Sequence, residues 1–244
     1  MKTINDIQYS SYPETLIDVH LPETDTFPVF IYFHGGGLEA GTKNFDINLY
    51  KTLVNNGIAV VTANYRMYPS ARYPEFIVDS ASACKWAVEH MGEYGNVTGY
   101  WVGGSSAGGY LSMMLCFDPS YLAAVGLTPL SFNGFVLDAG QPTCHFNVLR
   151  ERGLDTRRVI IDESAPLYHI GTSEKYPDML IIVSDDDMFN RLEQTRLMES
   201  TLIHFGHKNF KSVLMHGKHC QYVTAVDENG VSVFGKIVTE FIRK

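Results

Sequence analysis

The chain has 244 residues, of which 45% are hydrophobic, 12% aromatic and 19% charged. This composition is typical of a folded protein with a substantial core, and it excludes a disordered chain, a collagen-like repeat and a coiled coil. The formal net charge is −8 with no run of Lys or Arg, so neither nucleic acid nor an anionic membrane is an expected partner. We expect one domain over residues 1–244, because α/β folds often reach about 250 residues as one unit.

The sequence begins without an apolar stretch typical of a secretory signal, and no apolar run approaches the ~20 residues that span a bilayer. We therefore expect a cytoplasmic protein. The four cysteines have neither a CxxC pair nor zinc-site spacing, so we expect free thiols, with no metal and no cofactor. A homo-oligomer is compatible with the sequence. The cysteines are Cys84, Cys116, Cys144 and Cys220.

Short apolar runs rich in Val, Ile and Phe alternate with segments of helical period. This pattern predicts a mostly parallel central sheet with helices on both faces, an α/β fold. The runs predict strands at 15–21, 29–33, 58–63, 100–103, 134–137, 179–183 and 211–215. Helices are expected at 74–90, 106–116, 190–205 and 231–242, with weaker signals at 46–55 and 146–152.

A long irregular connection follows the strand at 134–137 and runs over residues 138–176. Connections of this length are typical of functional lids or caps. We expect this insert to cover the substrate site, with aromatic and polar side chains such as His145, Phe146 and Tyr168 as candidates to line the pocket.

Gly104-Ser105-Ser106-Ala107-Gly108 matches the pattern G-x-S-x-G and directly follows a predicted strand. A sharp strand-to-helix turn of this kind holds the serine in a strained conformation, and larger flanking side chains would clash. Ser106 is therefore the candidate nucleophile. Ser105 is the rival, but its own frame has alanine in place of the second glycine.

His34-Gly35-Gly36-Gly37 follows another predicted strand. Glycine backbone N–H groups can approach the oxyanion that forms during acyl transfer, and the HGGG sequence is typical of lipases and esterases. We expect Gly36 and Gly37 to donate to this oxyanion together with Ala107, the residue after the nucleophile. His34 is interpreted as a side chain that stabilises the turn.

A serine hydroxyl needs a base, and the base needs an orienting carboxylate. In enzymes with a G-x-S-x-G turn of this kind, the acid and then the histidine follow the serine along the chain. The strand at 179–183 leads into Ser184-Asp185-Asp186-Asp187, and the strand at 211–215 leads into His216-Gly217-Lys218-His219. Residue chemistry alone leaves the choice within each run open.

These motifs resemble the α/β-hydrolase superfamily, in particular hormone-sensitive-lipase-like and small bacterial carboxylesterases. The resemblance extends from residue 16 to the carboxyl terminus and implies an α/β-hydrolase fold with a small insert, residues 138–176, after the sixth strand. The further segments that carry it are Leu16-Ile17-Asp18-Val19-His20-Leu21-Pro22, Asn64-Tyr65-Arg66-Met67-Tyr68-Pro69, Tyr73-Pro74 with Asp79 and Trp86, and Gly103 to Gly109.

The resemblance also implies a choice within each run. The family's acid lies in a strand–G-x-x-D turn, which points to Asp187, with Asp186 as the alternative because serine replaces the glycine. The family's glycine shortly before the histidine favours His219 over His216. The family usually has an amino-terminal helical cap, and here only about fifteen residues precede the first family-like strand.

Together, residue chemistry and resemblance predict a serine carboxylesterase with Ser106, His219 and Asp187 as the catalytic triad. Short-chain acyl or aryl esters, including acylated sugars, are the expected small-molecule substrates. Two alternatives stay open: an amide hydrolase such as an arylformamidase, and a non-catalytic binding protein with a hydrolase fold.

Overall fold

A single mixed sheet of eight strands crosses the molecule in the computed structural model, which describes all residues 1–244. The strand order is β1-β2-β4-β3-β5-β6-β7-β8, and the strands from β4 onward in this order run parallel. β1 pairs antiparallel with β2, and β2 pairs antiparallel with β4. The strands are β1 (Lys2–Gln8), β2 (Leu16–Leu21), β3 (Thr26–Phe33), β4 (Ala59–Ala63), β5 (Asn96–Ser105), β6 (Gly134–Asp138), β7 (Asp178–Asp186) and β8 (Phe210–Lys218).

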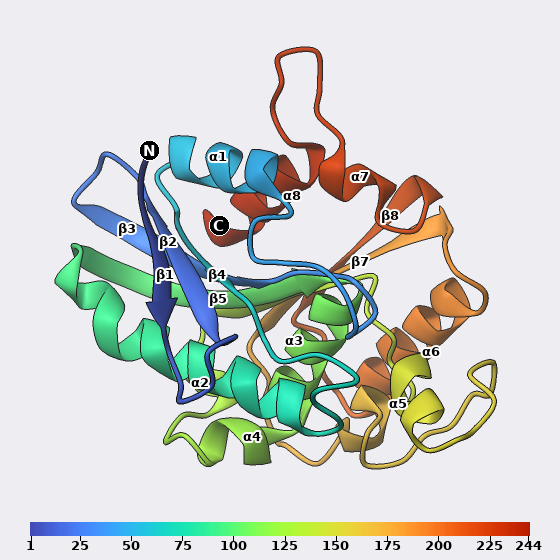
Figure 1. Ribbon diagram of the computed structural model, residues 1–244. Helices are drawn as coiled ribbons and strands as arrows, with labels where there is room; N and C mark the ends of the chain where they lie inside the picture. The colour runs from blue at the N-terminus through green and yellow to red at the C-terminus, as the bar shows by residue number, and fades with distance from the viewer.

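Helices cover both faces of the sheet (Figure 1). α1 and α8 pack together on one face, with α7 beside them, while α2, α3, α4 and α6 lie on the other. α5 lies beyond the carboxyl ends of the strands, beside α6. The helices are α1 (Ile47–Asn55), α2 (Glu75–His90), α3 (Ala107–Phe117), α4 (Pro119–Ala123), α5 (Phe146–Glu151), α6 (Arg191–His204), α7 (Gln221–Thr224) and α8 (Val233–Ile242), with short 3-10 helices at Met91–Glu93, Pro129–Ser131 and Pro166–His169.

The central strands are buried on both faces, and this explains their nearly continuous apolar sequences. In β3, Ile31 and Phe33 belong to the larger core under α2 and α3, whereas Phe30 and Tyr32 belong to the smaller core under α1 and α8. Alternate side chains of a strand point to opposite faces. Each central strand therefore contributes side chains to both cores.

All seven predicted strands and all six predicted helices are present, with ends that differ by a few residues. β1 was not predicted, because its residues are all exposed or half-buried and an edge strand of this kind lacks the apolar alternation that identifies a buried one. α4 and α7 were not predicted either, because they have only five and four residues.

The insert at 138–176 follows β6 and is more ordered than its sequence suggested, because it contains α5 and a 3-10 helix. All four cysteines are free thiols. None of the helices combines the length and the apolar character that crossing a bilayer requires.

Candidate active site

Ser106 occupies the sharp turn between β5 and α3. Its backbone has φ 57° and ψ −112°, a conformation that costs a non-glycine residue energy and is concentrated at functional sites. The flanking glycines are required by close approach to the end of β3: a Cβ on Gly104 would lie 2.5 Å from the Phe33 carbonyl oxygen, and one on Gly108 would lie 1.9 Å from it. The G-x-S-x-G spacing thus reflects backbone packing around the serine.

Ser106, His219 and Asp187 form a continuous hydrogen-bonded chain. The Ser106 hydroxyl lies 2.9 Å from His219 Nε2, and His219 Nδ1 lies 2.6 Å from Asp187 Oδ1. Because a carboxylate can only accept, Nδ1 is the donor, and the free lone pair of Nε2 faces the serine. These three side chains come from the ends of β5, β8 and β7, which meet at one edge of the parallel sheet.

The Asp187 carboxylate is enclosed, with only 1% of its side chain exposed. Burial opposes its charge, but the hydrogen bond from His219, the nearby imidazole and the N–H of Met188 outweigh burial and lower the pKa of Asp187. The Met188 N–H donates to Asp187 Oδ1 at 2.7 Å. Asp187 is thus held as an anion beside the imidazole.

The rival residues lie elsewhere. Ser105 is buried, and its hydroxyl accepts a hydrogen bond from Tyr32 at 3.0 Å. Asp186 is exposed. His216 makes a separate pair with Asp185 at 2.6 Å, but the His216 side chain is 88% exposed and no serine is hydrogen-bonded to it.

The glycine loop after β3 lies beside Ser106. Gly36 and Gly37 have φ of 118° and 67°, values that L side chains rarely adopt. Neither N–H donates to an acceptor within the chain, and Ala107 is the first residue of α3, where N–H groups have no partner in the helix. Gly36 and Gly37 line the same groove as Ser106. The loop therefore presents free donors beside the candidate nucleophile.

The buried His34 side chain stabilises this loop. Its ring stacks on Tyr65 at 4.5 Å, and its Nδ1 lies 2.7 Å from the Gly35 carbonyl oxygen. Burial lowers the pKa of His34 to about 4, so the ring is neutral at pH 7. This agrees with a turn-stabilising side chain.

α5 of the insert also contacts the glycine loop. Asn147 is fully buried, and its Nδ2 donates to the Gly37 carbonyl oxygen at 2.9 Å. Arg150 and Glu39 form an ion pair between the same two segments. Sequence reasoning missed Asn147, because 110 residues separate it from Gly37 and no local motif marks it.

A groove of about 480 Å³ surrounds Ser106 and His219. Phe146 of the insert lines it, as predicted, with Phe45, Asp46 and Met188 among the other lining residues. The predicted lining role of Tyr168 is wrong, because its side chain lies away from this groove and is 56% exposed.

The third predicted lining residue, His145, does not line the groove. His145 lies behind Phe146, where it is buried and accepts a hydrogen bond from the Asn147 N–H at the start of α5.

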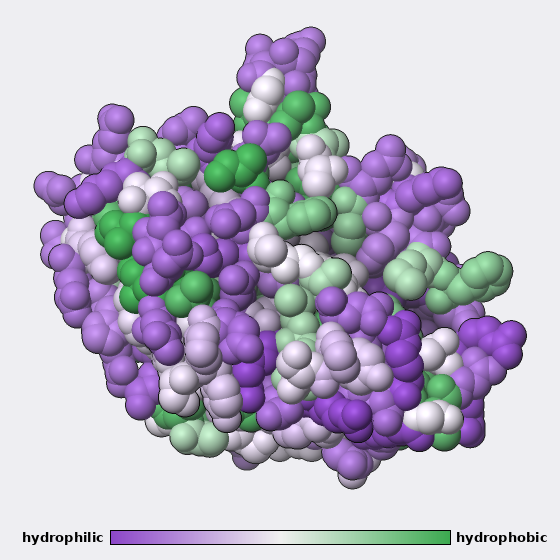
Figure 2. Space-filling view, viewed as in Figure 1, coloured by the Kyte–Doolittle hydropathy of each residue, from purple (hydrophilic) through white to green (hydrophobic).

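The space-filling view shows apolar surface along the middle of the face above α3. It also shows a protruding apolar segment over the β7–α6 connection, where Met188 and Phe189 are exposed (Figure 2).

A buried polar network lies behind the candidate nucleophile. Asp138 is fully buried at the end of β6, and the hydroxyl of Tyr222 donates to its Oδ1. Its backbone carbonyl accepts the Ser106 N–H at 2.9 Å. Burial raises the pKa of the Asp138 carboxyl to about 7, although hydrogen bonds from Ser105 and Tyr222 act in the opposite direction.

We expect Asp138 to make the stability of the chain pH-dependent. Its folded-state pKa is raised from 3.8 to about 7, so the folded state binds more protons than the unfolded state between these values, and stability falls as the pH rises through this window. Relative to Asp138→Asn, the wild-type chain should lose free energy of unfolding from pH 4 to pH 7, as measured by urea titration. Asp186→Asn, at an exposed carboxyl, is the control. A pH-independent difference between wild type and Asp138→Asn would contradict this assignment.

Comparisons with known proteins agree with the geometry. Residues 17–121 match the BD-FAE family model. Carboxylesterase NlhH of Mycobacterium tuberculosis is 32% identical over 130 residues, which is 52% of this chain and 40% of the relative. Tuliposide A-converting enzyme b1, amyloplastic, of Tulipa gesneriana is 31% identical over 130 residues, 48% of this chain and 34% of the relative. The similarity thus spans only about a third to two fifths of these relatives.

Solved structures extend the likeness to the whole chain. Esterase B from Lactobacillus rhamnosis superimposes with a TM-score of 0.79 at 16% identity, covering 99% of this chain and 85% of that one. Propionate-bound esterase 2 of Thermogutta terrifontis has a TM-score of 0.78 at 19% identity, covering 98% and 93%. A truncated carbohydrate esterase from gut microbiota has a TM-score of 0.78 at 17% identity, covering 100% and 95%. At these identities the likeness establishes the fold.

Proposed function

We propose that this chain, which has the α/β-hydrolase fold, is a serine carboxylesterase acting on short-chain acyl or aryl esters. The observation that carries the proposal is the hydrogen-bonded chain from Ser106 through His219 to Asp187, beside the free N–H groups of Gly36 and Gly37. The sequence similarity to carboxylesterases supports it. The groove of about 480 Å³ has the size of a small-molecule site.

In the proposed mechanism, Ser106 Oγ attacks the ester carbonyl carbon while His219 Nε2 accepts the hydroxyl proton. Asp187 holds the imidazole in the tautomer that can accept it and stabilises the imidazolium that forms. The oxyanion receives hydrogen bonds from Gly36, Gly37 and Ala107.

Collapse of this tetrahedral intermediate then breaks the bond to the alcohol. His219 returns the proton to the departing oxygen, which leaves the acyl group on Ser106. Water, deprotonated by His219, attacks the acyl-enzyme through a second tetrahedral intermediate. The carboxylic acid leaves, and Ser106 regains its proton.

Hydrolysis of 4-nitrophenyl acetate, followed by release of nitrophenolate, tests the activity directly. N-formylkynurenine in a parallel assay distinguishes an ester hydrolase from an amide hydrolase, and we expect the ester to be turned over faster. Absence of both turnover and labelling by a fluorophosphonate would instead support a non-catalytic binding protein.

Residues 1–244 form one unit in this proposal, with 138–176 as the insert that covers the site. α5 of this insert contacts the glycine loop through Asn147 and Arg150. A cytoplasmic location also belongs to the proposal, because a reducing compartment keeps cysteines such as the four in this chain as thiols.

Asn147 is expected to position the oxyanion donors without touching the substrate. Asn147→Ala removes the hydrogen bond to the Gly37 carbonyl. The Gly37–Leu38 peptide and the rest of the glycine loop can then shift. We expect kcat for 4-nitrophenyl acetate to fall about tenfold with little change in KM, since the donors stabilise the transition state more than the bound ester.

Asn209→Ala is the matched control. Asn209 donates to the backbone carbonyls of Tyr176 and Pro177, both at 2.7 Å, so its loss lowers stability outside the site. An equal fall in kcat in both variants, or an unchanged kcat in Asn147→Ala, would show that Asn147 has only a structural role.

A further inference from the structure

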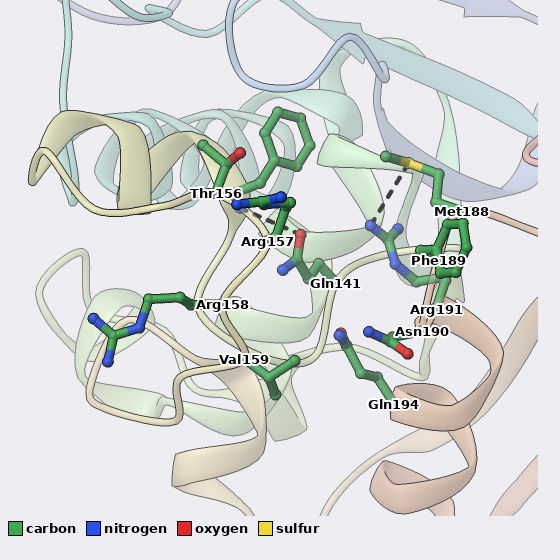
Figure 3. A pocket seen from close by; sticks show the side chains of 11 residues that line it. Gln141, Thr156, Arg157, Arg158, Val159, Met188, Phe189, Asn190, Arg191 and Gln194 are labelled. Carbon is green, nitrogen blue, oxygen red and sulfur yellow. Dashed lines mark hydrogen bonds between the residues drawn. The ribbon is translucent and has the colours of Figure 1, made fainter.

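A second pocket of about 500 Å³ adjoins the catalytic groove. It lies between the insert and the start of α6, and it shares the side chains of Phe146 and Met188 with the groove that holds Ser106. The remaining lining residues are Gln141, Thr156, Arg157, Arg158, Val159, Phe189, Asn190, Arg191 and Gln194 (Figure 3). A substrate bound at Ser106 can therefore extend past Phe146 and Met188 into this second space.

The charges of the two spaces differ in sign. Three arginines and no acidic residue line the second pocket, whereas Glu39 and Asp46 line the catalytic groove. This accumulation of positive charge is local, because the whole chain carries a net charge of −8. An anionic ligand gains nothing from the overall charge and would be selected by this pocket alone.

Arg191 is the buried cation of the pocket. Its side chain is 4% exposed, and no carboxylate lies within ion-pair distance. Its guanidinium donates to the Ala139 carbonyl and lies 3.9 Å from the sulfur of Met188, a contact visible in Figure 3. The Asp187 carboxylate attracts this guanidinium from beyond ion-pair distance, so the positive charge at the pocket wall is only partly compensated, and buried charges are ordinarily paired.

Arg157 and Arg158 contribute unequally. Arg157 is bound by Asp155 through Nε and Nη2, so its charge is neutralised within the loop. Arg158 has no ion-pair partner, and in Figure 3 its side chain extends away from Arg191 at the outer edge of the pocket. The unpaired charge therefore comes from Arg191 on the wall and Arg158 at the edge.

Neutral hydrogen-bonding groups complete the wall. Gln141 and Gln194 are both buried at 7% and 8% exposure and are connected through Thr143, which hydrogen-bonds to each. The pocket thus combines fixed amides with unpaired guanidinium groups, the donor set that recognises a carboxylate.

We propose that this second pocket binds the carboxylate of an anionic ester, so that the enzyme prefers substrates in which one half of the ester carries a free acid. This inference rests on the proposed esterase function and specifies its substrate class. The ester carbonyl lies at Ser106 and the carboxylate lies beyond Phe146 and Met188, next to Arg191.

Two matched pairs of esters test this preference and show which half of the substrate enters the pocket. 4-Acetoxybenzoate and 4-acetoxybenzamide differ only by a carboxylate on the alcohol half. The 4-nitrophenyl monoester of terephthalic acid and its terephthalamide counterpart differ in the same way on the acyl half. We expect kcat/KM to favour the anionic member of one pair about tenfold, the scale of a hydrogen bond to a charged group.

Arginine variants connect the preference to the pocket. Arg158→Gln and Arg191→Gln should each reduce the ratio of kcat/KM for the anionic ester to that for the neutral ester. Arg196→Gln, at an exposed position of α6 outside the pocket, should retain this ratio. High salt should also reduce this ratio of kcat/KM values, because salt screens exposed charges. If Arg191→Gln does not fold, the salt dependence and Arg158→Gln together test the proposal.

The inference is overturned if, in each pair, the wild-type chain hydrolyses the anionic and the neutral ester with equal kcat/KM. It is also overturned if no arginine variant that folds changes the ratio of these two values. Neutral esters separate this failure from failure of the proposed function. Turnover of 4-nitrophenyl acetate without a preference for the anion rejects only the pocket assignment, whereas no turnover of any ester rejects the esterase itself.

Discussion

Ser106→Ala should abolish hydrolysis of 4-nitrophenyl acetate, with kcat reduced on the order of 10⁶-fold. The Ser106 hydroxyl lies 2.9 Å from His219 Nε2, whereas the Cys220 thiol lies 3.6 Å from that nitrogen and burial raises its pKa, which keeps it protonated and a poor nucleophile. Without it no acyl-enzyme forms, and only transition-state stabilisation by the glycine loop remains. Steady-state kinetics and labelling by a fluorophosphonate measure the two consequences separately.

Ser105→Ala separates the candidate nucleophile from its neighbour. Ser105 is buried and hydrogen-bonded to Tyr32, so the Ser105→Ala chain should still take up the fluorophosphonate label, and mass spectrometry should locate it on Ser106. The melting temperature of Ser106→Ala should stay close to that of the wild type. Retained hydrolysis by a folded Ser106→Ala chain would refute the proposed mechanism.

Asp187→Asn should reduce kcat about 10⁴-fold while the chain stays folded. An amide at this position can donate to His219 Nδ1, which favours the tautomer with a proton on Nε2. That nitrogen then cannot accept the proton of Ser106. Asp187 also accepts the N–H of Met188 at 2.7 Å, so a modest loss of stability is expected beside the loss of turnover.

Asp186→Asn is the matched control for this change, because it makes the same substitution one residue away on an exposed side chain. We expect its kcat to equal that of the wild type. If Asp186→Asn lost activity and Asp187→Asn retained it, the assignment would revert to the alternative that the sequence left open. Thermal denaturation of both variants shows whether a loss of activity reflects unfolding.

Much of the fold could be predicted from local pattern. β3, β4, β6 and β7 are nearly continuous apolar runs because parallel strands here are buried on both faces. The predicted α/β-hydrolase fold is confirmed by the structural comparisons. β1 was missed because its half-exposed residues carry little periodic signal, and its antiparallel pairing with β2 depends on the neighbouring strand.

The candidate site, like the fold, could be predicted from the sequence only in part. Ser106 and the glycines around it were evident because their backbone needs are local: a strained turn and close approach to β3 constrain residues adjacent in sequence. Asp187 and His219 could be narrowed to short runs by strand order, and resemblance then selected within each run. Asn147 and Arg191 had no such signal, because their contacts join segments far apart in the chain.

The sequence by itself determined the fold class, the nucleophile turn, the glycine loop and the two short runs that hold the acid and the base. Each depends on backbone conformation or strand periodicity over a few neighbouring residues. The tertiary structure decided which side chains meet: it enclosed Asp187, left Asp186 and His216 exposed, and brought α5 against the glycine loop. It also placed unpaired arginines beside the groove, because burial and charge compensation are set by distant segments that only packing brings together.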